Sequence, residues 1–286
     1  MAGISQRERT ASGTGVVFSS GFFGFFAHAG FLNALRELGI KPLGCAGASS
    51  GAIVAAMAAA GMSDQTIKEI LFHVRKADFW DPDPVIHIVK SALRFFRGYR
   101  GYLRGDAYGK LLKQIPIKHI EDCLLPLLIV ATNLSLQREE RFTKGPLIKA
   151  IQASGAVPGL FKPVEIDGAL FVDGGMVNKA PVQALADLIQ PEKIIVHFIA
   201  SVNIGDRPDS FLQKRVTPWH MYHLAVNVSR HEAYQRQCDS VRKQGIEVIE
   251  VRTHSSGVGP DNLAKGPQAY RKAKEGALKI LSSIKF

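Results

Sequence analysis

A serine between two glycines, in the stretch Gly47-Ala48-Ser49-Ser50-Gly51, is the first residue whose surroundings suggest chemistry. The apolar residues before Ser49 predict a strand, and the small residues after it predict a helix. In such a turn the two glycines let the backbones pass, and the serine lies at a helix N-terminus, where N–H groups favour developing negative charge. Ser49 is therefore a candidate nucleophile. Two alternatives are a strand–helix crossing with an inert serine and a phosphate-binding loop, which the absence of G-x-x-x-x-G-K-[ST] disfavours.

A carboxylate in the stretch LFVDGGMVNKAP is the second candidate. Asp173 ends a short apolar run, and Gly174 and Gly175 form the turn that follows. Asp-Gly-Gly is also ordinary turn chemistry, so a purely structural role stays open. Open α/β sheets nevertheless place their sites at the carboxyl ends of strands, where Asp173 is expected.

A Gly-rich segment, Ser19-Ser20-Gly21-Phe22-Phe23-Gly24, follows the first apolar run. A loop of this kind can turn backbone N–H groups toward a substrate, as an oxyanion hole requires. The alternative is a plain strand–helix turn. The phenylalanines in and after the loop suit a core or an acyl pocket equally well; they stand at positions 22, 23, 25 and 26.

The elements that must position these residues alternate along the chain. Apolar runs predict strands at 14–20, 42–48, 126–134, 168–175, 192–201 and 246–251, and the longer runs are typical of strands buried on both faces of a parallel sheet. Helices are predicted at 25–39, 49–61, 63–77 and 268–286, the last with Ala273, Ala277, Ile280 and Ile284 on one face and lysines around the rest. This order predicts an α/β fold with helices on both faces of a mainly parallel sheet.

Composition sets the broader limits. The chain has 286 residues, of which 46% are hydrophobic and 21% charged, as in globular proteins. We expect a flexible tail at 1–13 and a single domain over 14–286. No apolar run reaches the roughly 18 residues of a membrane span, and the first residues lack the apolar core of a secretory signal. Three cysteines without metal or disulfide spacing favour a reduced cytoplasmic setting and no metal site.

The net charge of +11 favours an anionic partner, either nucleic acid or a membrane surface. The alternative is a basic surface that is simply solvated and binds no partner. The segment RFFRGYRGYLRG interleaves cations with aromatic rings, a pattern that suits single-stranded nucleic acid, a lipid interface or a solvated loop. Its arginines are Arg94, Arg97, Arg100 and Arg104.

Taken together, the motifs resemble those of the patatin-like phospholipases. IQASGAVPGLFKPVEIDGALFVDGGMVNKAPV resembles a family stretch almost position by position, and GYLRGDAYGKLL and LLIVATNL…RFTKG are similar to further segments, so that the resemblance covers about residues 14–200. It implies a three-layer α/β/α fold of the FabD/lysophospholipase-like type. It also implies a dyad without histidine or cofactor, in which Ser49 is the nucleophile and Asp173 the general base. The oxyanion hole would then come from Ser20, Gly21 and Phe22, with Gly24, Gly47, Gly51, Gly174 and Gly175 as motif glycines.

The chain departs from this family in the Gly-rich loop. Ser19 replaces the first glycine, and Phe23 replaces the basic residue that often precedes the last one. Of the histidines, His28 is expected to pack near the site and His197 to lie in the core, while His254 is the alternative third member of a triad.

The resemblance implies a phospholipase A or lysophospholipase that cleaves carboxylic esters. A transacylase on the same dyad and a lipid-binding protein with an impaired site remain alternatives. It also favours an anionic membrane over nucleic acid as the partner of the four arginines, and so a cytoplasmic protein that binds membranes transiently.

Overall fold

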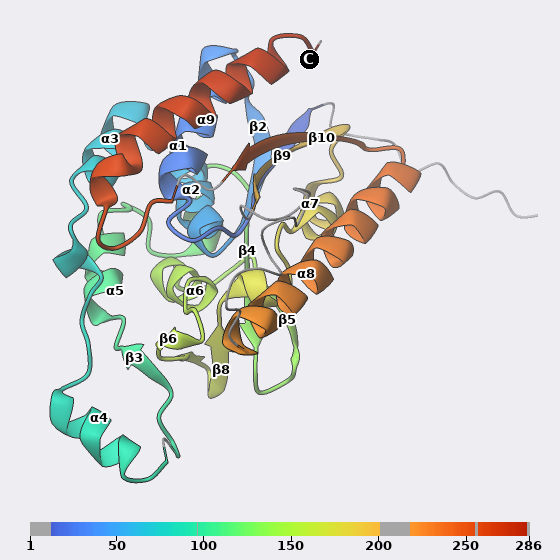
Figure 1. Cartoon of the computed structure of the whole chain (residues 1–286). Helices are drawn as coiled ribbons and strands as arrows, with labels where there is room; N and C mark the ends of the chain where they lie inside the picture. The colour runs from blue at the N-terminus through green and yellow to red at the C-terminus, as the bar shows by residue number, and fades with distance from the viewer. Residues whose placement is uncertain (1–12, 96, 201–217, 255–256, 285–286) are drawn as a thin grey trace, which may run out of the picture.

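A mainly parallel sheet of eight strands forms the centre of the molecule. The computed structural model describes residues 13–95, 97–200, 218–254 and 257–284 (Figure 1). The strand order is β10-β9-β1-β2-β4-β8-β7, with β5 paired to β4. The strands β10, β9, β1, β2 and β4 run parallel to one another, whereas β5 and β8 pair antiparallel with β4, and β7 pairs antiparallel with β8. The strands are β1 (Thr14–Phe18), β2 (Pro42–Ala48), β4 (Leu127–Asn133), β5 (Arg138–Phe142), β7 (Val164–Ile166), β8 (Ala169–Val172), β9 (Lys193–Ala200) and β10 (Glu247–His254).

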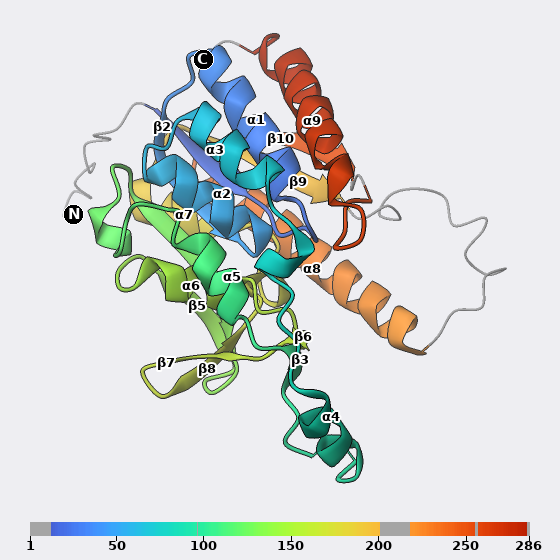
Figure 2. The ribbon, with the colours of Figure 1, turned by 90° about the vertical axis from the view of Figure 1, so that its left-hand side faces the viewer.

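Helices cover both faces of this sheet (Figures 1 and 2). One face carries α1 (Phe25–Glu37), α2 (Ser50–Ala59), α3 (Asp64–Phe72), α6 (Leu147–Ser154) and α9 (Gly266–Leu281). The other carries α7 (Val182–Ile189) and α8 (Pro218–Lys243). Alternate strand residues enter the two cores: Val16 and Phe18 pack under α1, and Val17 packs under α7. The predicted α/β fold with a mainly parallel sheet between two helical layers is thus confirmed.

An arm projects from this body (Figure 2). It contains α4 (Val85–Ala92) and returns through β3 (Gly101–Leu103), which pairs with β6 (Gly159–Phe161) in a separate two-stranded sheet. A short helix, α5 (Asp106–Leu112), follows and packs on α6. No helix in the described part of the chain is long and apolar enough to cross a membrane.

Several element ends differ from those expected. β2 has the predicted bounds, whereas β1 ends at Phe18, and the N–H group of Ser20 bonds to the carbonyl of Lys179 in another loop rather than to a strand. In α9, Ala273 and Ala277 of the predicted apolar face are buried, whereas Ile280 is 37% exposed. The helix packs on α1 through small residues, and a Cβ at Gly30 would lie 2.1 Å from the Tyr270 carbonyl oxygen. The expected tail lies outside the described residues except for Gly13.

Candidate active site

Ser49 occupies a sharp turn between β2 and α2. Its φ of 54° and ψ of −123° fall in a region that side chains rarely adopt and that costs about 1–3 kcal/mol. The flanking glycines are required by close backbone contacts: a Cβ at Gly47 would lie 2.5 Å from the Gly51 oxygen, and one at Gly51 would lie 2.3 Å from the Phe18 oxygen. The spacing of the motif therefore has a steric cause, and the turn lifts the serine hydroxyl out of the sheet.

The carboxylate of Asp173 meets this hydroxyl. Ser49 Oγ donates to Asp173 Oδ2 at 2.5 Å, and the Gly175 N–H donates to Asp173 Oδ1 at 2.7 Å. The turn presses closely on β4, because a Cβ at Gly174 would lie 1.9 Å from the Val130 oxygen. Both carboxylate oxygens of Asp173 thus accept a hydrogen bond, and the two residues expected to form the dyad are hydrogen-bonded to each other.

Burial changes the basicity of Asp173, which is only 6% exposed. Desolvation raises its pKa above the ordinary value, while the hydrogen bond from Ser49 and the positive charge of Arg230 oppose the rise, as do the Gly175 N–H and Lys179. A carboxylate with a raised pKa is a better proton acceptor than one in water. An arrangement of this kind can accept a proton without a histidine.

The Gly-rich loop lies against this pair. Contrary to expectation, the Ser20 N–H is not free to stabilise an oxyanion, because it donates to the Lys179 carbonyl at 2.7 Å. The N–H groups of Gly21 and Phe22 have no acceptor among the described residues, and both residues line the same cavity as Ser49. A Cβ at Gly24 would lie 2.4 Å from Ile199 Cδ1 and 3.0 Å from the Gly21 carbonyl oxygen, so a larger residue there would have to displace the Ile199 side chain. Two of the three predicted donors remain available.

The cavity beside Ser49 is apolar and narrow. It encloses about 100 Å³, less than the roughly 300–1,000 Å³ of common small-molecule pockets, so a slender chain fits it better than a bulky ring system. Phe22, Phe23 and Phe25 line it, whereas Phe26 is 1% exposed and belongs to the core. Three of the four phenylalanines thus line the cavity, and the fourth belongs to the core.

The histidines considered as possible partners of Ser49 make no contact with it in the described structure. His28 and His197 are fully buried and bonded to each other, with their Nδ1 atoms 2.7 Å apart. His254 is exposed at the end of β10, the edge strand, which is separated from β2 by β9 and β1. No histidine of the described chain hydrogen-bonds to Ser49 or Asp173. Among the same residues, no group of three or more His, Cys, Asp or Glu side chains could hold a metal ion.

Three polar residues that the sequence did not single out also belong to the site. Tyr108 lines the cavity, and burial and Asp173 raise the pKa of its hydroxyl. Lys179 is 4% exposed, and burial and Arg230 lower its pKa to about 7. Arg230 Nη2 donates to Ser20 Oγ at 2.7 Å. Lys179 stands within the Asp-Gly-Gly block and could have been noticed there, whereas no motif points to Arg230.

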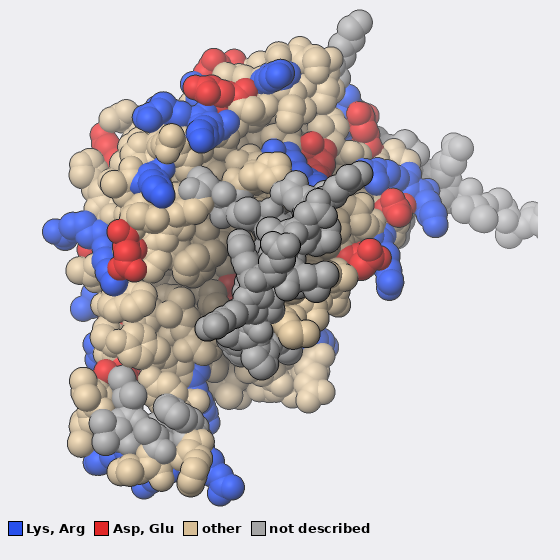
Figure 3. All heavy atoms as spheres, in the orientation of Figure 1, with Lys and Arg blue, Asp and Glu red and all other residues tan. Residues whose placement is uncertain are grey.

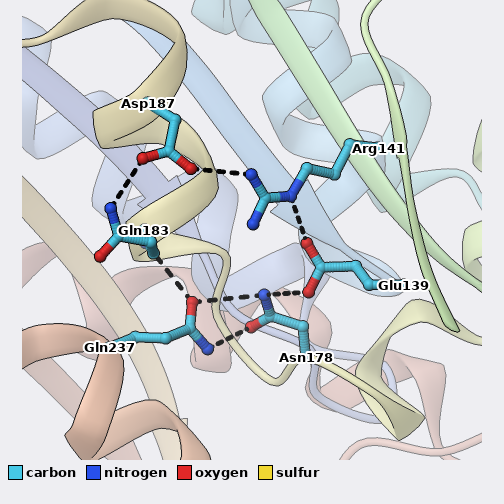
Figure 4. A network of polar contacts seen from close by, with 6 residues as sticks. All are labelled: Glu139, Arg141, Asn178, Gln183, Asp187 and Gln237. Carbon is cyan, nitrogen blue, oxygen red and sulfur yellow. Dashed lines mark hydrogen bonds and ion pairs between the residues drawn. The ribbon is translucent and has the colours of Figure 1, made fainter. Parts of the chain in front are cut away.

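A polar network attaches α7 and α8 to the loop that follows Asp173 (Figure 4). Asn178 of this loop and Gln237 of α8 exchange amide hydrogen bonds of 3.3 and 3.1 Å, and Asn178 also donates to Glu139 at 2.9 Å. Arg141 of β5 bridges Glu139 and Asp187 at 2.6 and 2.8 Å. The network therefore connects three elements, β5, α7 and α8, to the loop that carries Asn178.

Comparison with known proteins finds similar sequences and folds. The sequence model of the family described as patatin-like phospholipase matches residues 16–186. An uncharacterized NTE family protein of Mycobacterium tuberculosis is 32% identical over 187 residues, which are 65% of this chain and 49% of that protein. The chain thus spans about half the length of its mycobacterial relatives.

More distant relatives have names that state an activity. Lysophospholipase NTE1 of Mycosarcoma maydis is 29% identical over 174 residues, 60% of this chain and 9% of that protein. Among solved structures, VipD from Legionella pneumophila is similar with a TM-score of 0.53 and 16% sequence identity, over 96% of this chain and 67% of that chain. This last likeness concerns the fold alone.

Proposed function

We propose that this chain, which belongs to the patatin-like phospholipase family, is a serine hydrolase that cleaves a carboxylic ester of a phospholipid or lysophospholipid. The observation that carries the proposal is the 2.5 Å hydrogen bond from Ser49 Oγ to the buried Asp173 carboxylate, beside an apolar cavity. The name of the fungal lysophospholipases adds support from the comparisons.

The reaction would proceed in two halves. Ser49 Oγ attacks the ester carbonyl carbon while its proton moves to Asp173, and the carbonyl oxygen becomes an oxyanion that accepts from the N–H groups of Gly21 and Phe22. The C–O bond then breaks, and the leaving alcohol takes the proton from Asp173. In the second half a water molecule gives a proton to Asp173 and attacks the acyl carbon. The tetrahedral species collapses, the acid leaves, and the proton returns to Ser49.

The narrow apolar cavity supports a substrate with a long acyl chain. A chain lying along Phe22, Phe23 and Phe25 would place its carbonyl near Ser49, since all four residues line the same space. Burial of each methylene contributes about 0.8 kcal/mol. We therefore expect long-chain esters to be better substrates than short ones, mainly through KM.

The decisive experiment is a panel of lipid esters incubated with the wild type, Ser49→Ala and Asp173→Asn. Release of fatty acid by the wild type alone supports the proposal. Fatty acid released equally by all three proteins would refute it, because the dyad would then be irrelevant. Addition of acyl acceptors such as lysophospholipids distinguishes a transacylase, which forms a new ester instead of free acid. A fluorophosphonate that labels the wild type but not Ser49→Ala argues against a lipid-binding protein with an impaired site.

We further propose that the arm brings the enzyme to anionic membranes. Its hollow is lined by Arg94, Arg97 and Arg100 together with Lys90 and Lys162, whereas Asp83 is its only acidic lining residue. Figure 3 shows Lys and Arg side chains along the lower edge of the arm. Leu93 and Phe95 are 78% and 91% exposed beside them. Cations beside exposed apolar groups suit the boundary between anionic headgroups and acyl chains.

Arg104 differs from the other three arginines that we expected to contact lipid. Its Nε lies 3.9 Å from Asp106, and it does not line the hollow. The proposed membrane surface therefore consists of the hollow and the apolar side chains near it, and Arg104 serves as a matched control.

A further inference from the structure

Arg230 of α8 contacts the Gly-rich loop at Ser20. Its Nη2 donates to Ser20 Oγ at 2.7 Å and its Nη1 donates to Asn227 at 3.3 Å, while its buried Nε has no partner among the described residues. Ser20 is also held by its main chain, since its N–H donates to the Lys179 carbonyl. The residue immediately before Gly21 is thus fixed from two sides.

Ser20 and the Asp173 turn are in close contact. A Cβ at Gly175 would lie 2.4 Å from Ser20 Oγ, so the hydroxyl that Arg230 binds rests directly on the turn that carries the dyad carboxylate. A displacement of Ser20 would therefore move the following N–H groups of Gly21 and Phe22 relative to Ser49.

The helix that carries Arg230 is firmly docked. Gln237 lies two turns further along α8 and bonds to Asn178 of the Asp173 loop (Figure 4). Between them, Tyr234 is 1% exposed, packs on Phe198 and donates to Glu250 at 2.6 Å. Arg230 is therefore presented by a rigid element.

The charges around Asp173 make this arginine electrostatically relevant. Lys179 and Arg230 both oppose the rise in the pKa of Asp173 that burial causes, while Ser49 and Tyr108 face the same carboxylate without charge. Lys179 has a pKa lowered to about 7, so near neutral pH only part of its population carries charge. A guanidinium stays charged throughout this range. Arg230 is thus the permanent cation beside the dyad.

We propose that Arg230 is a positioning residue of the hydrolase: from α8 it supplies the positive charge that the Gly-rich loop lacks at Phe23, and through Ser20 it holds the N–H groups of Gly21 and Phe22 beside Ser49. The inference rests on the proposed hydrolase function. It explains how a loop without its own basic residue can still be ordered for oxyanion binding.

The test uses a soluble p-nitrophenyl ester and the variants Arg230→Gln, Ser20→Ala and their combination, with Arg242→Gln as control, since Arg242 lies on the same helix and pairs with Asp239 at the surface. We expect Arg230→Gln to lower kcat about 10- to 100-fold with little change in KM, because small misplacements of catalytic groups cost about that much. Ser20→Ala should lower kcat similarly, and the double variant should lose little more. Arg242→Gln should behave as the wild type.

A pH profile separates this role from general support of the fold. Without the cation the pKa of Asp173 rises, so the acid limb of kcat/KM should move to higher pH in Arg230→Gln but not in Arg242→Gln. Arg230→Lys keeps the charge and should restore the acid limb, with only partial recovery of kcat because an ammonium lacks the planar fork. Ser20→Ala keeps the guanidinium and tests the contact even if Arg230→Gln is unstable.

The outcomes are distinct. Equal kcat in the wild type and Arg230→Gln, additive losses in the double variant, or an acid limb of Arg230→Lys that follows Arg230→Gln would each overturn the inference while the hydrolase function stands. A wild type that neither turns over the ester nor reacts with a fluorophosphonate would remove the proposed function and this inference with it.

Discussion

The buried pair of His28 and His197 predicts a marked loss of stability in mild acid. His28 Nε2 lies 2.8 Å from the Ser19 carbonyl oxygen, which can only accept, so this nitrogen carries the proton. His28 Nδ1 must then accept from His197 Nδ1–H at 2.7 Å, and His197 Nε2 accepts from Thr253 Oγ1 at 2.9 Å. A proton added to His28 would have to enter between the two Nδ1 atoms. Both rings are therefore neutral in the folded protein.

The sign and size of the effect follow from the pKa values. Burial lowers the pKa of His28 from 6.5 to about 3, and burial and His28 lower that of His197. Below a pH of about 6.5 the two histidines bind protons in the unfolded chain but not in the folded chain, so the free energy of unfolding falls as the pH falls. At pH 5 the loss from His28 is about 2 kcal/mol, and it grows by about 1.4 kcal/mol for each further pH unit until its folded pKa is reached. His197 adds to it in the same direction.

Urea unfolding between about pH 7 and pH 5 measures this loss. The raised pKa of Asp173 acts with the opposite sign, so all proteins should carry Asp173→Asn. In that background we expect the free energy of unfolding to fall less steeply with pH in His28→Leu/His197→Leu than in the parent, whatever its value near neutrality. His254→Leu changes an exposed histidine and should keep the parent slope. Equal slopes in the double variant and the parent would show that the pair titrates normally and would refute this reasoning.

Three further predictions follow from the site and the arm. Ser49→Ala and Asp173→Asn should each lower kcat by about 10³-fold or more, and the double variant should lose little more, since the two act as a unit; steady-state kinetics that showed multiplied losses would contradict the pairing. Lys179→Met should raise the melting temperature, because a lysine whose pKa burial lowers to about 7 destabilises the fold by up to a few kcal/mol at neutral pH; an unchanged or lower melting temperature would mean that the ammonium is well compensated. Replacing three arginines of the arm with Gln should reduce co-sedimentation with anionic vesicles by about 10²-fold at low salt, since each cation contributes about 1 kcal/mol, and added salt should weaken binding of the parent protein. The control variant Arg104→Gln should bind as the parent does. Vesicle binding that changes neither with salt nor with the triple substitution would refute the membrane proposal. The three arginines replaced in this last experiment are Arg94, Arg97 and Arg100, which line the hollow of the arm.

Local patterns were sufficient to predict much of this molecule. The strand and the turn around Ser49 follow from small residues at required close contacts, and Asp173 follows from a strand that ends at a turn. The long apolar runs predicted the parallel strands because those strands are buried on both faces. The prediction that residues 14–286 form one domain stays a prediction.

Long-range contacts were beyond the sequence. Arg230 reaches Ser20 across 210 positions of the chain, and nothing in the local composition of α8 distinguishes it from the other arginines of that helix. The short strands β3, β5, β6 and β7 were also missed, because they hold few apolar residues and depend on partners that tertiary folding brings to them. Ser20 was expected to offer its N–H to an oxyanion, and only the Lys179 carbonyl, from another loop, shows why it does not.

No histidine among the described residues hydrogen-bonds to Ser49 or Asp173, and this fold offers a physical explanation. The buried imidazole of His28 is hydrogen-bonded to the Ser19 carbonyl and to His197, and burial holds its pKa at about 3, so it would be a poor base even within reach of Ser49. The basicity must then come from the carboxylate, which desolvation strengthens and nearby cations moderate. Too much burial would protonate Asp173 at neutral pH, and too much positive charge would make it a weak base. In the proposed hydrolase, the balance between the buried site and Arg230 would thus set the pH range in which Asp173 accepts the proton of Ser49.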